Sequence, residues 1–191
     1  TSSLIYEMLK KEGFDTYLGG NIGEPPFSFL NKLNAQSKVV LELSSFQLQD
    51  LTKSPHIGVV LMVTSEHLDY HKDVYEYVDA KRNIIRFQTA SDAAIINKDY
   101  SAGRESDVET AGKVFNVSRD QEVERGAFVK DDAVWIRLEG KSKKIIDAKD
   151  ILLPGRHNLE NVSAAVMAGA LSGVTVPTMV SVLKSFKGLE H

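Results

Sequence analysis

The 191-residue sequence contains no cysteine, and its charges nearly balance at a formal net charge of −3. Without cysteine, the chain has no disulfide framework, no thiolate zinc site and no thiol nucleophile. The slight acidic excess provides no electrostatic footprint for nucleic acid, so we expect no nucleic-acid partner. The longest apolar stretch, around residues 57–63, is far too short to cross a bilayer, and no signal segment opens the chain. We therefore expect a soluble, cytoplasmic protein without a membrane span.

What remains is an ordinary globular composition, with 42% hydrophobic and 26% charged residues. This length and hydrophobic content can bury a sizeable core, and we expect a single domain over residues 1–191. Short apolar, β-branched runs at 38–43, 57–63 and 93–97 alternate with helical patterns at 73–87 and 159–172. This alternation predicts the α/β class, with a mostly parallel sheet flanked by helices.

The sequence pattern changes between about residues 113 and 147, where short strand-like runs are separated by turn-forming residues. Asp131-Asp132 and Glu139-Gly140-Lys141-Ser142 are typical of hairpin turns. We expect a small antiparallel β patch here. The Gly140-Lys141-Ser142 triplet ends like a phosphate-binding loop, but Trp135 stands where the first glycine is required, so the match is accidental.

Two polar signals precede this patch. The run Gly19-Gly20-Asn21-Ile22-Gly23 would let the backbone approach a ligand closely, with Asn21 as donor and acceptor; an ordinary glycine turn is the alternative. Glu42 lies near the carboxyl end of the apolar run at 38–43, with Ser44 just after that run. Because ligands gather at the carboxyl ends of parallel strands, Glu42 is well placed for a metal, unless it lies on a solvated edge strand.

Two further candidate residues lie just before and within the predicted helix at 73–87. His67 lies among carboxylates directly after the second strand, and a single histidine ligand to a divalent cation is the simplest functional interpretation. Lys81 falls within the apolar stripe of the helix. A lysine there either extends its amine to solvent or serves a function, and extension is the more frequent outcome.

Asn158 and Asn161 lead into an alanine-rich helix. Asn158 is well placed to cap that helix, but capping does not explain the pair, and paired amides can read the edge of a base.

Together these segments resemble the central ATPase domain of the Mur ligase family, which has a P-loop NTPase-like fold. The resemblance spans essentially the whole chain, and the run Glu42-Leu43-Ser44-Ser45-Phe46-Gln47 is similar to the D-glutamate-adding members. It implies an ATP-dependent ligase with two Mg²⁺ sites, and UDP-N-acetylmuramoyl-L-alanine and D-glutamate as substrates. We expect a monomer.

The resemblance also implies roles for individual residues. Glu42 would bind the Mg²⁺ near the ATP phosphates, and His67 the second Mg²⁺. Lys81 would be carbamylated and present a carboxylate to that second metal. Asn21 and Ser44 would place the muramoyl substrate. The remaining pair, Asn158 and Asn161, would lie at the adenine.

Two departures qualify the resemblance. Thr1 would lie just after the phosphate loop of the family, so that loop and its strand would be missing, as would the N- and C-terminal domains. Met62 stands where relatives often carry asparagine. We therefore expect the isolated chain to be inactive. The alternatives are another ATP-dependent amide ligase, such as a sister Mur ligase or folylpolyglutamate synthase, and a catalytically silent interaction domain.

Overall fold

The computed structural model describes residues 1–61, 73–100 and 109–188, and its strands form two sheets. The smaller sheet pairs two strands in parallel: β1 (Thr16–Gly20) and β2 (Lys38–Glu42). The larger sheet has six strands in sequential order: β3 (Ile57–Val60), β4 (Ala93–Asn97), β5 (Lys113–Ser118), β6 (Gly126–Lys130), β7 (Ala133–Leu138) and β8 (Lys141–Asp147). The first four of these run parallel, which confirms the predicted α/β class.

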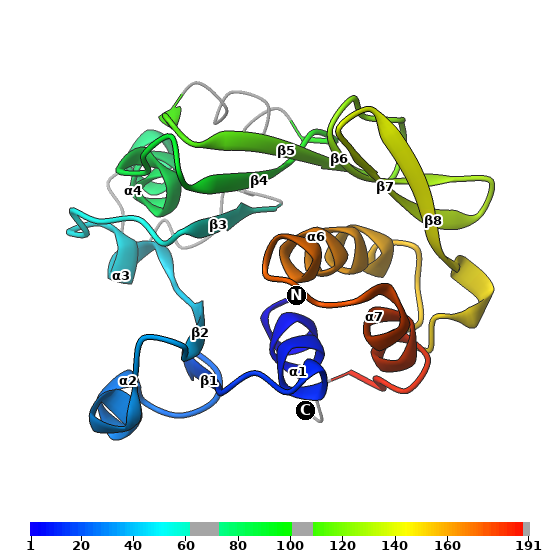
Figure 1. Cartoon of the computed structure of the whole chain (residues 1–191). Helices are drawn as coiled ribbons and strands as arrows, with labels where there is room; N and C mark the ends of the chain where they lie inside the picture. The colour runs from blue at the N-terminus through cyan, green and yellow to red at the C-terminus, as the bar shows by residue number, and fades with distance from the viewer. Residues whose placement is uncertain (62–72, 101–108, 189–191) are drawn as a thin grey trace.

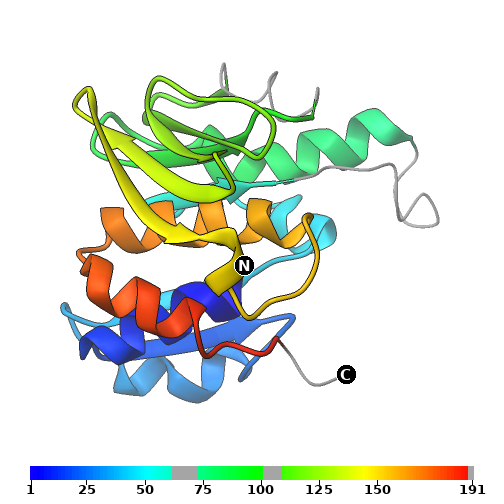
Figure 2. The ribbon, with the colours of Figure 1, turned by 90° about the vertical axis from the view of Figure 1, so that its right-hand side faces the viewer.

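The long helices lie on the two faces of the larger sheet. Helix α6 (Asn158–Leu171) lies under the six strands, with α1 (Ser2–Glu12) and α7 (Val176–Leu183) beneath it (Figures 1 and 2). Helix α4 (Val74–Arg86) covers the opposite face at β3. The short elements are α2 (Pro26–Phe29), η1 (Leu30–Lys32), α3 (Ser45–Leu48) and η3 (Ala148–Asp150). No helix in the described part of the chain is long and apolar enough to span a membrane.

Strand β4 carries the core on both of its faces, because all five of its residues are buried. Ala93 and Ile95 join the main hydrophobic cluster, which includes α1, α6 and α7. Ala94 and Ile96 join a second cluster, which includes Ile85 of α4. This two-sided burial explains the continuous apolar run in the sequence.

The predicted antiparallel patch over 113–147 is confirmed at β6, β7 and β8, but it begins later than predicted. Strand β5 pairs parallel with β4, and β6 pairs parallel with β5, so only the β6-β7-β8 pairings are antiparallel and the whole region continues the main sheet. Both predicted turns are confirmed as hairpins, but the second is shorter than expected, because Lys141 and Ser142 already belong to β8 and only Glu139 and Gly140 form the turn. Asp131, Asp132, Glu139 and Gly140 all have positive φ, as the right-handed twist of hairpin strands favours.

The two sheets are separated at β2 and β3, which are not paired with each other in the described residues. Val39 and Leu41 of β2 are each 40% exposed, whereas interior strands of a parallel sheet are buried. Because Glu42 and His67 each come at the end of an apolar run, we predict them at the carboxyl ends of adjacent parallel strands, facing a common cleft. In the described residues β2 and β3 belong to different sheets, so the predicted adjacency of the two strands is wrong there.

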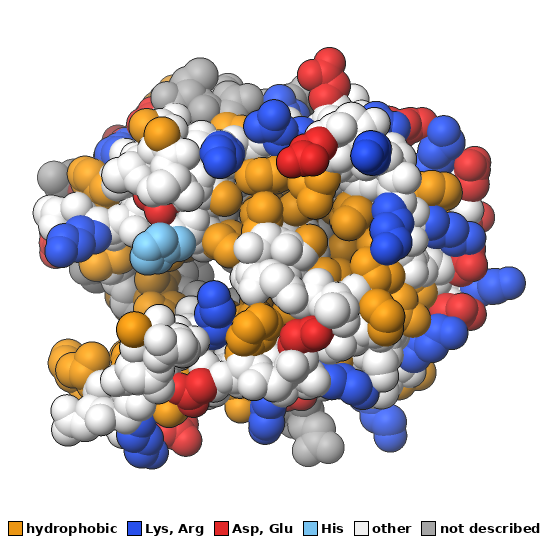
Figure 3. Space-filling view, viewed as in Figure 1, with side chains coloured by type: hydrophobic (Ala, Val, Ile, Leu, Met, Phe, Trp, Pro, Cys, Tyr) orange, Lys and Arg blue, Asp and Glu red, His pale blue; other side chains and the backbone are white. Residues whose placement is uncertain are grey.

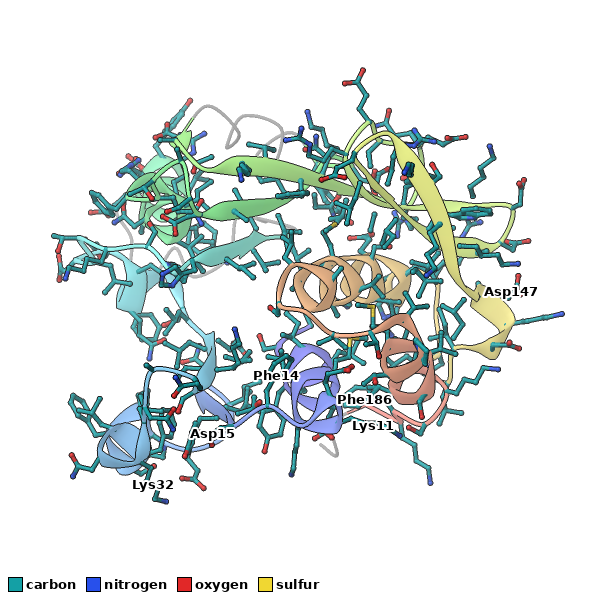
Figure 4. The ribbon with its side chains drawn as sticks, in the orientation of Figure 1. Lys11, Phe14, Asp15, Lys32, Asp147 and Phe186 are labelled. Carbon is teal, nitrogen blue, oxygen red and sulfur yellow. The ribbon has the colours of Figure 1, made fainter. Side chains whose placement is uncertain are left out.

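A polar junction fixes β2 against β1 at the lower rim of the molecule. Asp15 accepts hydrogen bonds from Asn34 and Ser37, and its carbonyl accepts from the Lys38 amide at 2.7 Å. Figure 4 labels Asp15 beside Phe14, which packs at the edge of the main hydrophobic cluster. The junction sets the register in which Gly20 lies opposite Glu42.

Candidate functional site

The glycine-rich loop after β1 lies directly on the end of β2. Gly20 has a φ of 102°, and a Cβ atom at this position would lie 2.1 Å from the Glu42 carbonyl oxygen. Only glycine fits this close approach without strain. The Asn21 amide donates to the same carbonyl at 2.9 Å, and the Asn21 side chain lies 3.5 Å from Glu42 Oε1. The loop thus brings two predicted site residues, Asn21 and Glu42, together.

The first residue of the chain lies between Glu42 and α6. The backbone nitrogen of Thr1 is buried and lies within electrostatic range of the Glu42 carboxylate. The Thr1 hydroxyl donates to Asn161 Oδ1 at 2.6 Å. The start of α1, the end of β2 and the first turn of α6 therefore meet at one place. The N-termini of α1 and α6 carry partial positive charge, which favours anions nearby.

Ser44 precedes α3, and its hydrogen-bonding groups turn inward to that helix. Its amide and its hydroxyl each donate to Gln47 Oε1 at 2.9 Å. The hydroxyl proton is therefore occupied. What Ser44 offers a ligand in this arrangement is the acceptor capacity of its oxygen.

Lys81 is half-buried on α4, and its amine packs on an aromatic ring instead of extending freely. Its Nζ lies 4.8 Å from the ring centroid of Tyr77, whose side chain is 2% exposed. The contact is a cation–π interaction one helical turn apart. His67 falls in the segment 62–72, outside the described residues, as does Met62, so the predicted meeting of His67 with Lys81 stays a prediction.

Asn158 does not cap α6, and the capping prediction is wrong. His157 occupies the N-cap position, and Asn158 is the first helical residue. The Asn158 side chain turns back and donates to the Pro154 carbonyl at 2.6 Å, while its oxygen accepts from Asn161 at 3.0 Å. The two predicted amides thus bind each other and form one unit.

A small cavity of about 200 Å³ lies beside this amide pair. Apolar side chains of Ile151, Leu153 and Leu159 line it together with Asn158 and Arg156. Apolar walls with one or two polar groups are the usual lining of a small-molecule site. A larger open hollow of about 430 Å³ on α4, lined by residues such as Asp73 and Arg82, contains none of the predicted site residues.

Sequence reasoning missed the most connected carboxylate of the region, Glu160. It is 6% exposed and accepts from Asn97 at 3.0 Å, from the Tyr100 hydroxyl at 3.1 Å and from Arg119 at 2.7 Å. These contacts tie the ends of β4 and β5 to the first turn of α6. The available signal was a carboxylate in an otherwise apolar, alanine-rich helix, which requires a partner when buried.

The described residues contain no group of three histidines, aspartates or glutamates that could hold a metal by themselves. Mg²⁺ needs no such cage, because it commonly binds one or two carboxylates and completes its shell with water and substrate phosphates. The half-buried Glu42 carboxylate, beside the α1 N-terminus, fits this donor chemistry.

Curated proteins of similar sequence align with the whole chain. The chain is 44% identical over all 191 residues to the UDP-N-acetylmuramoylalanine--D-glutamate ligase of Acetivibrio thermocellus, and 40% identical to that of Clostridium botulinum (strain Langeland). It spans 41% of the length of each relative.

Solved structures share the fold at low sequence identity. The UDP-N-acetylmuramate:L-alanyl-gamma-D-glutamyl-meso-diaminopimelate ligase from Neisseria meningitides matches with a TM-score of 0.68 and 18% identity, over 100% of this chain and 63% of that one. MurF ligase from Thermotoga maritima, in complex with ADP, matches with a TM-score of 0.64 and 18% identity, over 98% and 46%. The family profile of the Mur ligase middle domain matches residues 1–169, and the chain belongs to this family.

Proposed function

We propose that this chain is the ATP-binding middle domain of a ligase that joins D-glutamate to UDP-N-acetylmuramoyl-L-alanine in peptidoglycan precursor synthesis. The relatives named above carry that activity in their names and align over the whole chain. The structural observation that carries the proposal is the convergence of Glu42, Asn21, Thr1 and Asn161 at one place. We place the reaction in the cytoplasm, where ATP and UDP-linked sugars occur.

The proposed metal ligands are Glu42, His67 and Lys81. Glu42 would hold a Mg²⁺ ion at the ATP phosphates, and His67 with a carbamylated Lys81 would hold a second. Bound Mg²⁺ offsets negative charge on the phosphoryl group being transferred. The position of Lys81 supports its role, because the side chain is half-buried on α4 and its Nζ is held 4.8 Å from the centroid of the Tyr77 ring.

The remaining roles divide between the two substrates. Asn21 and Ser44 would bind the muramoyl substrate, for which the exposed Asn21 amide and the Ser44 oxygen are available. Asn158 and Asn161 would bind adenine. The cavity beside Asn158 supports this, since its apolar walls suit a flat heterocycle and the paired amides supply the polar edge.

The reaction has two steps. An oxygen of the L-alanyl carboxylate attacks the γ-phosphorus of ATP, which yields an acyl phosphate and ADP. The amine of D-glutamate then attacks the acyl carbon, an amide bond forms, and inorganic phosphate leaves with the acyl C–O bond broken. In this scheme Asn21 and Ser44 orient the attacking carboxylate, and the α1 N-terminus faces the phosphates.

The break between β2 and β3 supports one more part of the proposal. A parallel strand added to the free edge of β2 would shield Val39 and Leu41 from solvent. Its carboxyl end would face Glu42 and the start of α1. We assign this place to the strand and phosphate loop that the family resemblance puts before Thr1.

The test is an acceptor screen with the full-length protein that contains this chain. We expect ligation of D-glutamate to UDP-N-acetylmuramoyl-L-alanine, dependent on ATP and Mg²⁺ and stopped by a chelator. Diamino acids, D-alanyl-D-alanine and L-glutamate are the comparison acceptors. Preference for one of these would assign the chain to a sister ligase, and no ligation with any acceptor would favour a silent domain.

Variants of Lys81 test the carbamate. Lys81→Ala should reduce ligation by about 10²-fold or more, and bicarbonate or a short-chain carboxylate should partly restore it. Lys81→Arg should fail as well, since guanidinium cannot be carbamylated. Lys10→Ala is the matched control, because Lys10 also lies over a tyrosine ring, at 5.4 Å, but is exposed on α1. Full activity in Lys81→Arg would refute the carbamate.

A further inference from the structure

Helix α4 is fastened to the segment between α3 and β3 by three polar ties. Asn83 donates to the carbonyls of Leu48 and Gln49, each at 3.0 Å. The Ser54 hydroxyl donates to the Asn83 carbonyl at 2.8 Å. Further along the chain, Gln88 donates to the carbonyls of Pro55 and Ala93. The irregular segment 49–56 therefore follows α4 closely.

The Asn83 amide is the most constrained of these groups. Its side chain is 6% exposed, and Oδ1 accepts from Arg86 Nη1 at 2.9 Å. With the guanidinium on one side and two carbonyls on the other, only one orientation of the amide satisfies every partner. Arg86 is itself held by Asp79 and Glu109. This orientation keeps the Asn83 Nδ2 group directed at the carbonyls at the end of α3.

The Asn83 hydrogen bonds connect the part of the chain that contains Glu42 and Ser44 to the helix that carries Lys81. Helix α3 has four residues, so its C-terminal carbonyls lie only about 6 Å along the axis from its start. Ser44 immediately precedes that start, and Glu42 ends β2 two residues earlier. Asn83 lies two residues after Lys81 on α4.

We propose that Asn83 is a positioning residue that sets the placement of Glu42 and Ser44 relative to Lys81. The inference rests on the proposed function, because it assigns importance to those three residues. Its physical basis is independent: apart from local bonds, such as those between Ser44 and Gln47 and from the Leu51 amide to the Leu48 carbonyl, the two Asn83 bonds connect the end of α3 to α4. Terminal helix carbonyls lack intrahelical partners, so these bonds from a neighbouring helix fix where the short helix sits. Loss of the tie should let α3 shift, and its first residue with it.

Gln88 provides a matched control for a purely structural role. It is 4% exposed, donates two hydrogen bonds from its side-chain amide and accepts a third from Thr110 at 2.8 Å. Its partners Pro55 and Ala93 lie at the starts of β3 and β4, the edge of the sheet opposite the strand carboxyl ends. Replacing Gln88 should therefore cost stability without moving α3.

The experiment compares Asn83→Leu, Asn83→Asp and Asn83→Ser with Gln88→Leu in the full-length protein. Asn83→Asp keeps the shape and the Arg86 contact but sets an oxygen against both carbonyls. Asn83→Ser is the milder variant that keeps the measurement possible if the others fold poorly. At comparable losses of melting temperature, the Asn83 variants should raise the Mg²⁺ concentration for half-maximal ligation and the KM of the UDP-linked substrate about tenfold. Gln88→Leu should change neither by more than about twofold.

Amide hydrogen exchange over residues 44–49 gives a readout that does not need activity. We expect faster exchange there in every Asn83 variant and unchanged exchange in Gln88→Leu. If Asn83 and Gln88 variants behave alike in exchange, Mg²⁺ dependence and KM, the positioning role is refuted. If the wild-type protein shows no ligation but exchange separates the two residues as expected, the tie stands and the proposed function falls.

Discussion

Strands β4 and β2 have the same length and similar apolar sequences, yet they lie in very different surroundings. All five residues of β4 are buried, whereas none of the five residues of β2 is. The difference follows from neighbours: β4 pairs on both sides, between β3 and β5, while β2 pairs with β1. Helices cover both faces of the first and leave the second partly open.

The same contrast holds for the surroundings of the two strands. The six-stranded sheet packs on α6, where ten of the eleven residues at 159–169 are buried and Glu160 has its hydrogen-bond and ion-pair partners. Near β1 and β2, apolar side chains such as Phe27 (87% exposed) and Leu30 (57% exposed) face solvent, and hydrophobic atoms are visible at the lower left of Figure 3. The candidate site therefore lies where a densely packed half meets a sparsely packed one.

The largest expected effect is the loss of unfolding free energy when a large apolar side chain is truncated in the densely packed half, compared with the same change near β2. Phe128→Ala on β6 removes a side chain that is 1% exposed and should lower the free energy of unfolding by about 3–5 kcal/mol. Leu41→Ala on β2 should cost less than about 1 kcal/mol because Leu41 is already 40% exposed. Urea unfolding of the chain, followed by circular dichroism, measures both. Equal costs would contradict the contrast.

A second comparison sets a structural carboxylate against a proposed functional one. Glu160→Ala removes the hydrogen-bond acceptor of Asn97 and Tyr100 and the carboxylate partner of the partly buried Arg119. This should lower the free energy of unfolding by about 2–3 kcal/mol. Glu42→Gln should leave the free energy of unfolding within about 0.5 kcal/mol, since Glu42 is half-buried at a strand end.

The second variant should instead abolish ligation in the full-length protein. Denaturant unfolding and the ligation assay, run on both variants, check the pair of expectations. A stable Glu160→Ala, or an active Glu42→Gln, would show that the roles have been assigned to the wrong carboxylate.

A third comparison tests how tightly the glycine loop is held on β2. Gly20→Ala should destabilise the chain by about 2 kcal/mol, because a Cβ atom would strain a φ of 102° and would lie 2.1 Å from the Glu42 carbonyl oxygen. Gly140→Ala is the control. Its φ is 75° but no atom lies within 4 Å of the added Cβ, so about 1 kcal/mol of backbone strain alone is expected. Thermal unfolding distinguishes them, and equal losses would mean that the loop yields easily.

The smallest effect concerns surface charge on α4, which lies at the border of the two halves. A hydrogen bond from Arg86 holds the pKa of the Asp79 carboxyl below its ordinary value. The pair therefore stabilises the fold above the unfolded-state pKa, and this contribution disappears as the pH falls through the folded-state pKa.

Asp79→Asn should accordingly cost less than about 1 kcal/mol at neutral pH, since the side chain is 60% exposed and solvent screens the pair. The difference from wild type should vanish on acidification below about pH 4. Stability measured against pH in both proteins checks this. A difference that grows in acid would contradict the sign.

The sequence was sufficient wherever local chemistry decides the structure. The bounds of β4, the end of α1 at Gly13 and the Asp131-Asp132 turn all follow from residue type and spacing. The direction of β5 and β6 did not follow, because short alternating strands look alike whether their neighbours run parallel or antiparallel.

The candidate site was predictable in part for the same reason. Glu42 and Asn21 meet because strand ends and glycine turns have local signatures. Glu160 and Asn83 escaped notice because their partners lie 63 and 35 residues away, and nothing in the surrounding residues announces such a partner. His67 and its metal stay a prediction.

The uncovered side of β2 also has a consequence for handling the chain. In the described residues β2 has a partner strand on one edge, and Val39 and Leu41 are half-exposed; such an open edge is a template onto which an extended segment of another molecule can add. At high concentration this edge should recruit strands from neighbouring molecules and start aggregation. A lysine in place of Val39 would place charge on that edge and should raise the concentration at which the chain stays in solution.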